Sequence, residues 1–142
     1  MKKLKPQTVN FEQISQFLSG AEKKLASARK VFAVDEEAAY QLAYEAMLKG
    51  SLGFMLSHGV RPRTGPGHHI TIIEFSEKHL GGEFKSLISM FNRMRRKRHD
   101  TIYAVNAFIS RGDAEQALET AGQYLVIIRK EIQKSNPQKK LL

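Results

Sequence analysis

Apolar residues recur at intervals of three and four along much of this chain, which is the spacing of one face of an α-helix. The first such stripe extends from residue 11 to residue 32 and alternates with charged positions such as Glu22, Lys24 and Arg29. Its apolar members are Ile14, Phe17, Leu18, Ala21, Leu25, Ala28 and Phe32. This pattern predicts a first amphipathic helix.

A second helix is predicted from residue 36 to about residue 58, where the sequence contains no proline and many good helix formers. Asp35 is placed to cap its first turn, and Gly59 stands where a helix commonly ends. Its apolar face consists of Ala39, Leu42, Ala43, Ala46, Met47, Gly50 and Phe54. Because most of these side chains are small, a neighbouring helix can approach closely.

The next segment, VRPRTGPG, holds two prolines and two glycines and is predicted to be an irregular, exposed connection. The apolar residues that follow, Ile70, Ile72, Ile73 and Phe75, fit a strand as well as a short helix. Since the sequence offers no partner strand and a lone strand is marginal in water, we predict a short helix ended by the pair of glycines at 81–82.

The helical stripe restarts at Phe84, Leu87, Ile88 and Phe91 and is predicted to resume at Ile102, Val105 and Phe108. Between these two parts, residues 93–99 form a polar interval inside or between helical segments. Ser110 and Asp113 are spaced as a capping box before a last helix. The apolar stripe of that helix consists of Ala114, Ala117, Leu118, Ala121, Tyr124, Leu125, Ile128 and Ile132.

These segments predict an all-α protein, an up-and-down bundle of four to five helices. The 142 residues are enough for one domain with a continuous core and too few for two typical ones. We expect a single domain over residues 1–142, with its core at about 10–134 and frayed ends beyond, where Pro137 blocks a longer last helix.

The amino-acid composition excludes some kinds of functional site and favours certain partners. The chain has no cysteine, which excludes disulfides, thiolate metal sites and a cysteine nucleophile. No stretch approaches the roughly 20 apolar residues of a membrane span, and the amino terminus does not read as a signal peptide, so we expect a cytoplasmic protein. The net charge of +9 favours polyanionic partners, with nucleic acid ahead of membrane lipid.

Three segments of the chain resemble parts of a known protein family. The segment AAYQLAYEAMLKGSLGFMLSHGVRPRTGPGHHITIIEF is similar to the second helix, loop and third helix of HEPN domains. RMRRKRHDTIYA and SRGDAEQALETAGQYLVIIRKEI are similar to the basic motif helix and the Ala-rich closing helix of that family. The resemblance runs from about Leu25 to Ile132, in matching order and spacing.

The resemblance implies a dimeric helical bundle associated with RNA or nucleotides. Many members are ribonucleases, often of toxin type, and others are partners of minimal nucleotidyltransferases. Their characteristic motif is an arginine followed after four to six residues by histidine, and cleavage through it needs no metal or other cofactor. The implied partners here are RNA or a nucleotide, a second copy of the chain, and a nucleotidyltransferase as the alternative.

Two alignments of that motif compete. In the preferred one, Arg98 is the motif arginine, His99 takes the polar position after it, and Tyr103 stands where active members carry histidine. This agrees with the Arg-Asn-x-x-x-Tyr variant of the family, and it removes the imidazole that active members use. In the other alignment, Arg93 pairs with His99 across five intervening residues.

If the chain cleaves RNA, His99 is the expected acid or base, because imidazole transfers protons near neutral pH and phenol does not. Arg98 or Arg95 would hold the phosphate, and Arg95 and His99 lie one helical turn apart on the same face. The wider phosphate-binding set is Arg93, Arg95, Arg96 and Lys97. The alternative is that residues 93–99 form only a solvated face, and Tyr103 either stacks on a base or packs in the core.

Histidines elsewhere raise the question of a metal site, and we predict none. The candidates are His58, His68, His69 and His79, but His68 and His69 are adjacent and therefore diverge on a helix, and few carboxylates lie near them in the sequence. We expect His68 instead to cap or buttress the helix that follows Gly67.

Overall fold

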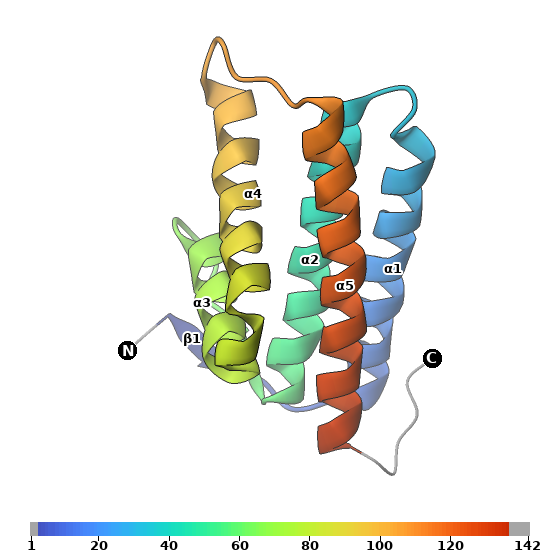
Figure 1. Ribbon diagram of the computed structural model, residues 1–142. Coiled ribbons are helices and arrows are strands. Elements are labelled where there is room, and N and C mark those ends of the chain that lie inside the picture. Colours follow the sequence, from blue (N-terminus) through green and yellow to red (C-terminus); the bar gives the residue numbers. More distant parts are fainter. Residues whose placement is uncertain (1–2, 137–142) are drawn as a thin grey trace.

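The computed structural model describes residues 3–136, and this part of the chain is a bundle of α-helices with one small strand pair at its base (Figure 1). Its helices are α1 (Phe11–Val31), α2 (Glu36–Ser57), α3 (His68–Leu80), α4 (Lys85–Tyr103) and α5 (Arg111–Ser135), with a short 3-10 turn at Gly82–Phe84. The predicted all-α bundle of four to five helices is confirmed. The predicted single domain stays a prediction, and its frayed tail from Pro137 onward lies outside the described residues.

Helix ends lie where the capping residues predict them. The Asp35 side chain accepts a hydrogen bond from the Ala38 amide at the start of α2, and Gly59 follows its end with a φ of +74°. At the start of α5, Ser110 and Asp113 form the predicted capping box, each side chain accepting from the other residue's amide. These bonds satisfy amides that have no partner within their helices.

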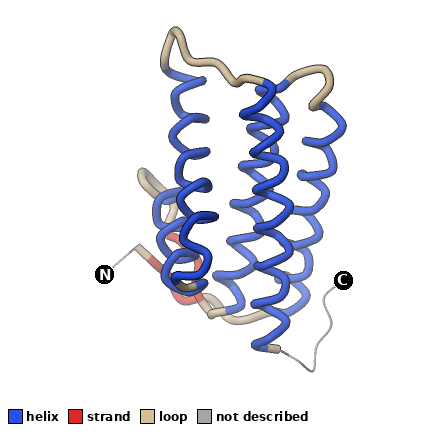
Figure 2. The backbone as a smooth tube through the Cα atoms, viewed as in Figure 1, coloured by secondary structure: helices blue, strands red, loops and turns tan. Residues whose placement is uncertain are grey.

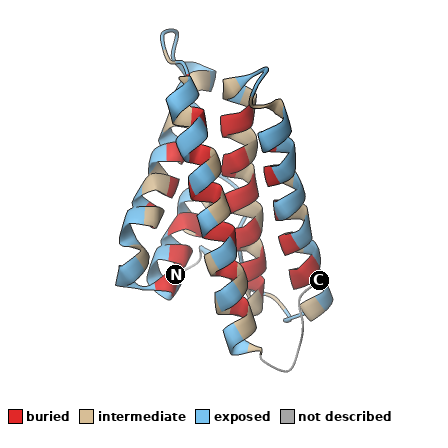
Figure 3. Ribbon diagram, turned by 45° about the vertical axis from the view of Figure 1, so that its right-hand side comes forward, coloured by how far each residue is buried: buried red, intermediate tan, exposed pale blue. Residues whose placement is uncertain are grey.

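The core lies between the inner faces of the helices, whose outer faces are exposed (Figure 3). α1 and α2 pack most extensively, and α5 packs against α2. Ala21, Ala43 and Ala46 are fully buried in this core. Gly50 leaves so little room that a Cβ there would meet the Leu125 side chain at 2.5 Å. The small residues of α2 therefore permit the close helix approach expected from the sequence.

The polar interval at residues 93–99 lies inside one continuous helix, because α4 extends from Lys85 to Tyr103. The prediction that the apolar stripe resumes at Ile102, Val105 and Phe108 is wrong. The chain is extended at Ala104, and Ile102, Val105 and Phe108 are 51%, 97% and 72% exposed. The helix ends at Tyr103, so Val105 and Phe108 lie in the non-helical connection to α5 and helical spacing no longer places them on one face.

The strand pair was not predicted. β1 (Leu4–Pro6) pairs antiparallel with β2 (Val60–Pro62), which lies inside the segment predicted to be irregular (Figure 2). Gln7 adds a bond from its amide to the Gly59 carbonyl. The pair ties the amino-terminal segment to the connection between α2 and α3. Residues 68–80 form a helix, as predicted, and not a strand.

The long helices α1, α2, α4 and α5 alternate in direction, whereas α3 is short and packs on one side against α2 and α4 (Figure 1). The connection at 60–67 rises along the bundle before α3 begins, so the first turn of α3 faces α4 part of the way along its length. No helix within residues 3–136 is long and apolar enough to cross a membrane.

Candidate functional site

A pocket of about 310 Å³ lies where the first turn of α3 meets the carboxyl-terminal half of α4. Its lining combines cationic, imidazole and aromatic side chains from two helices that are distant in sequence. The lining residues are Gly67, His68, His69, Ile70, Arg95, Arg98, His99, Ile102 and Tyr103. The preferred motif residues Arg98, His99 and Tyr103 thus share one pocket with two histidines of α3.

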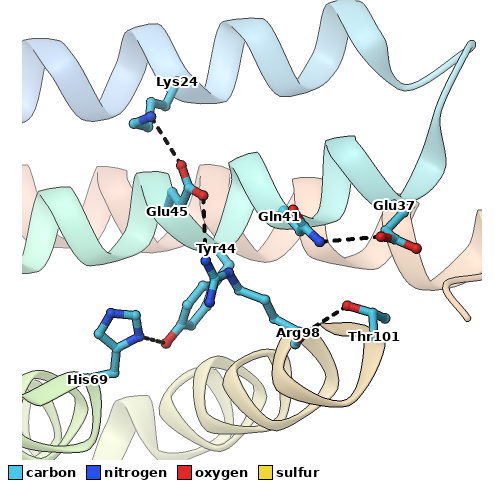
Figure 4. Close-up of polar contacts among 8 residues, drawn as sticks. All are labelled: Lys24, Glu37, Gln41, Tyr44, Glu45, His69, Arg98 and Thr101. Carbon is cyan, nitrogen blue, oxygen red and sulfur yellow. Dashed lines mark hydrogen bonds and ion pairs between the residues drawn. The ribbon is translucent and has the colours of Figure 1, made fainter. Parts of the chain in front are cut away.

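Arg98 points from α4 toward α2, where its guanidinium lies over the Tyr44 ring, 5.7 Å from the ring centroid (Figure 4). Its Nη2 atom is 4.0 Å from Oε2 of Glu45, a carboxylate that also pairs with Lys24 of α1 at 3.1 Å. Within the described chain, the buried Nε atom of Arg98 has no hydrogen-bond partner. The guanidinium is therefore positioned by its neighbours while retaining hydrogen-bonding capacity.

His69 is held by Tyr44, the same buried side chain of α2 that lies under Arg98. Its Nδ1 shares a 3.0 Å hydrogen bond with the Tyr44 hydroxyl, and the two rings lie 5.8 Å apart (Figure 4). Tyr44 is fully buried, so its hydroxyl depends on this bond. His69 is half-buried at the pocket wall, and its orientation is fixed from behind by Tyr44.

Burial and nearby charges both affect the ionisation of this pair. Burial lowers the pKa of His69, and the neighbouring His68, Arg98 and Arg95 lower it further, against a smaller opposite effect of Glu45. Burial raises the pKa of Tyr44. At neutral pH the site therefore holds a neutral imidazole and a neutral phenol beside two permanently charged guanidinium groups.

The rest of the predicted phosphate-binding set does not line this pocket. Arg93 is exposed and lines a separate groove between α4 and α5, together with Glu119 of α5. Lys97 pairs with Asp113 of α5 at 3.3 Å, and Arg96 is exposed. Hence Arg93 and His99, the pair of the second motif alignment, lie on different faces of α4, while Arg95 joins Arg98 and His99 as its helical spacing predicts.

Tyr103 is 73% exposed, so the alternative that it packs in the core is wrong. Its ring lies 4.6 Å from that of His99, which is itself exposed. Both rings stand at the mouth of the pocket, where they are accessible to a base or a nucleotide.

His68 is the first residue of α3, and its ring lies 4.6 Å from that of His69. His68 was expected to cap or buttress this helix; the cap is wrong, because the N-cap is Gly67 and no side chain caps the first turn, and the buttress stays a prediction. Across residues 3–136 there is no group of three or more His, Cys, Asp or Glu side chains arranged to hold a metal ion.

Sequence reasoning missed His69 and Tyr44 as members of the site. Their roles depend on α3 docking against α2 and α4, which the periodicity of each helix does not specify. One signal was available: a tyrosine on the small-residue face of α2 needs a hydrogen-bond partner if it is buried. From the sequence, the histidines at the start of α3 suggest a metal ligand or, for His68, a cap or buttress of the helix, and not a binding role for His69.

Comparison with known proteins adds one finding to this geometry. The family model described as "HEPN domain" matches residues 14–131, a range that contains every residue of the pocket. A search of curated proteins found no match.

Proposed function

Since this chain belongs to the HEPN domain family, we propose that it binds single-stranded RNA, holding a phosphate in the pocket between α3 and α4. One observation carries the proposal: Arg95 and Arg98 converge on a pocket that also presents His69, His99 and an exposed Tyr103. Guanidinium groups are the donors best suited to phosphate, and exposed aromatic rings stack on unpaired bases.

The surroundings of the pocket support an anionic ligand. Arg95 has its Nε bonded to Asn92 at 2.9 Å, which leaves its terminal nitrogens available for other acceptors. Arg98 adds a second guanidinium charge at the wall of the pocket, although its own Nε atom is buried. α3 begins at this pocket, and its first turn has no side-chain cap. The positive end of the α3 helix dipole therefore points toward the pocket. All of these features favour phosphate over a neutral ligand.

The test compares two arginines of the same helix. Arg95 lines the pocket and Arg93 lines the groove on the other side of α4, so Arg95→Gln and Arg93→Gln remove the same charge two residues apart. We expect Arg95→Gln to weaken binding of a labelled RNA oligonucleotide by about tenfold, and its plot of log K against log salt to lose about 0.7 in slope.

Arg93→Gln should weaken binding less than about twofold and leave the salt slope unchanged. Equal losses of RNA affinity in the two variants would contradict phosphate binding in the pocket. They would favour the alternative of a diffuse charged face. Fluorescence anisotropy at several salt concentrations measures both quantities.

A second function is favoured by a different observation. Four large apolar or aromatic side chains are exposed around the end of α4, namely Ile102, Tyr103, Val105 and Phe108. An exposed apolar cluster of this kind is typical of a protein contact. We therefore also propose the alternative role of a non-catalytic partner of a minimal nucleotidyltransferase. RNA binding that occurs only in such a complex, and not with the pure chain, would favour this second role.

A further inference from the structure

The motif position that carries histidine in active relatives is Tyr103 here, yet the pocket does not lack an imidazole. α3 supplies His69, whose position is fixed by a residue of α2 rather than by the motif helix. We propose that His69 is a catalytic residue that accepts the 2′-hydroxyl proton of RNA in a metal-free cleavage, with Tyr44 as its positioning residue. This inference rests on the proposed RNA-binding function.

The hydrogen bond to Tyr44 defines the working form of the ring. When Nδ1 carries the proton and donates it to the Tyr44 oxygen, Nε2 presents a lone pair. Tyr44 engages Nδ1 and His69 lines the pocket, so Nε2 is the ring nitrogen left to act on a bound substrate. When Nε2 takes up a proton, the Nδ1–H group still donates to Tyr44, so the ring keeps its orientation through the step.

The charged groups around His69 favour its role as a general base. His68, Arg95 and Arg98 oppose protonation of the ring, and Glu45, beyond Arg98, favours it weakly. Because burial and these neighbours lower its pKa, His69 stays neutral at neutral pH. Tyr44 itself stays neutral, because burial raises the pKa of its phenol.

The proposed cleavage of RNA balances in atoms and electrons with the groups that line the pocket. Nε2 of His69 takes the proton of the 2′-hydroxyl while the 2′-oxygen forms a bond to phosphorus. The bond between phosphorus and the 5′-oxygen breaks, and the leaving oxygen takes a proton from the protonated imidazole of His99. Arg95 and Arg98 stabilise the negative charge that develops on the phosphorane. The products are a 2′,3′-cyclic phosphate and a 5′-hydroxyl, and proton exchange with water restores both histidines.

The experiment measures binding and cleavage of the same RNA by the full chain. His69→Gln keeps a polar side chain of similar size, and His79→Gln is the matched control, because His79 lies on the same helix and burial also lowers its pKa. We expect His69→Gln to reduce cleavage at least a hundredfold and to change the Kd for RNA less than about threefold. His79→Gln should match the wild type in both measurements.

Tyr44→Phe provides the second variant. We expect kcat to fall about five- to tenfold with KM unchanged, and the acid limb of the kcat profile to move to lower pH, because the charged ring loses an acceptor. A purely structural role for Tyr44 would not shift that limb. Circular dichroism melting verifies that each variant is folded.

The results separate the two proposals. Wild type that binds RNA without cleaving it, or His69→Gln that cleaves as wild type does, overturns the role of His69 and leaves the binding function standing. Wild type that binds no RNA overturns both. The cyclic phosphate end of the product distinguishes this reaction from hydrolysis by a metal-dependent nuclease.

Discussion

Tyr124 is a fully buried residue whose hydroxyl joins three helices. It donates to the Ser76 hydroxyl of α3 at 2.9 Å and also contacts the Ser51 hydroxyl of α2. Ser51 in turn donates to the Met47 carbonyl at 2.7 Å. A polar group in an apolar core is costly unless it is hydrogen-bonded, so this chain of hydroxyls fixes how α3 and α5 align on α2.

Tyr124→Phe should therefore lower the free energy of unfolding by about 1–3 kcal/mol, because it leaves the buried Ser76 hydroxyl without its partner. Urea unfolding followed by circular dichroism measures the change. Tyr103→Phe is the control, since its exposed hydroxyl should contribute less than about 0.5 kcal/mol. Equal small effects of both substitutions would contradict a structural role for the buried network.

At the residue scale, the sequence predicted the motif side chains better than their neighbours. Arg98 and His99 were identified from the motif and Arg95 from helical spacing, and all three line the pocket. His69 was missed because its role depends on Tyr44, twenty-five residues earlier, contacting it across two helices. A helix periodicity reports which face is buried and does not report which helix covers it.

The first turn of α5 shows how an element is stabilised by its own cap and by a neighbour. Ser110 and Asp113 form the capping box, and Asp113 also pairs with Lys97 of α4 at 3.3 Å. The hydrogen bond from the Ser110 amide lowers the pKa of the Asp113 carboxyl most; burial raises it by less, and Lys97 lowers it further. Lys97, one of the basic residues of α4, thus helps to stabilise the position of α5.

Asp113→Ala should cost about 1 kcal/mol of stability at neutral pH, through loss of the cap. A carboxyl whose pKa is lowered by folding stabilises the protein above its ordinary value of about 4, and that contribution is lost as the pH falls through the folded-state value. The difference between wild type and variant should therefore shrink at acidic pH.

Urea unfolding at neutral and acidic pH measures this difference. Glu115→Ala, an exposed position two residues along α5, serves as the control and should change stability little. A difference between wild type and Asp113→Ala that is the same at both pH values would contradict the role of the ionised carboxylate.

At the scale of elements, the helices and their caps followed from local rules. Asp35, Ser110 and the glycines at 59 and 81 determine helix ends through their own backbone and side-chain chemistry. The prediction for Ile102 to Phe108 was wrong because the helix ends at Tyr103, and spacing cannot show where a helix without a clear stop signal ends. The pairing of β1 with β2 was missed because it joins distant residues in strands of three.

The whole molecule presents an apolar cluster at one end, beside its candidate site. We predict that, in the absence of another partner protein, the chain forms a homodimer through Val105 and Phe108, since burying these exposed side chains removes apolar surface from water. Phe108→Ser should raise the dimer dissociation constant at least tenfold, given about 1.5–3 kcal/mol for a buried apolar side chain.

Sedimentation equilibrium measures this constant. Val126→Ser is the control, because Val126 is an exposed apolar residue on the outer face of α5. A monomeric wild type, or a dimer equally sensitive to both substitutions, would contradict the assigned interface.

The α3–α4 pocket is the proposed place where this HEPN domain holds an RNA phosphate. The most direct test is a titration of the labelled chain with a short single-stranded RNA, followed by amide chemical shifts in NMR. We predict that the largest shifts fall at residues 67–70 and 95–103, the two segments that form the pocket. Shifts centred instead on the groove beside Arg93, or spread evenly over basic residues of the surface, would contradict the claim.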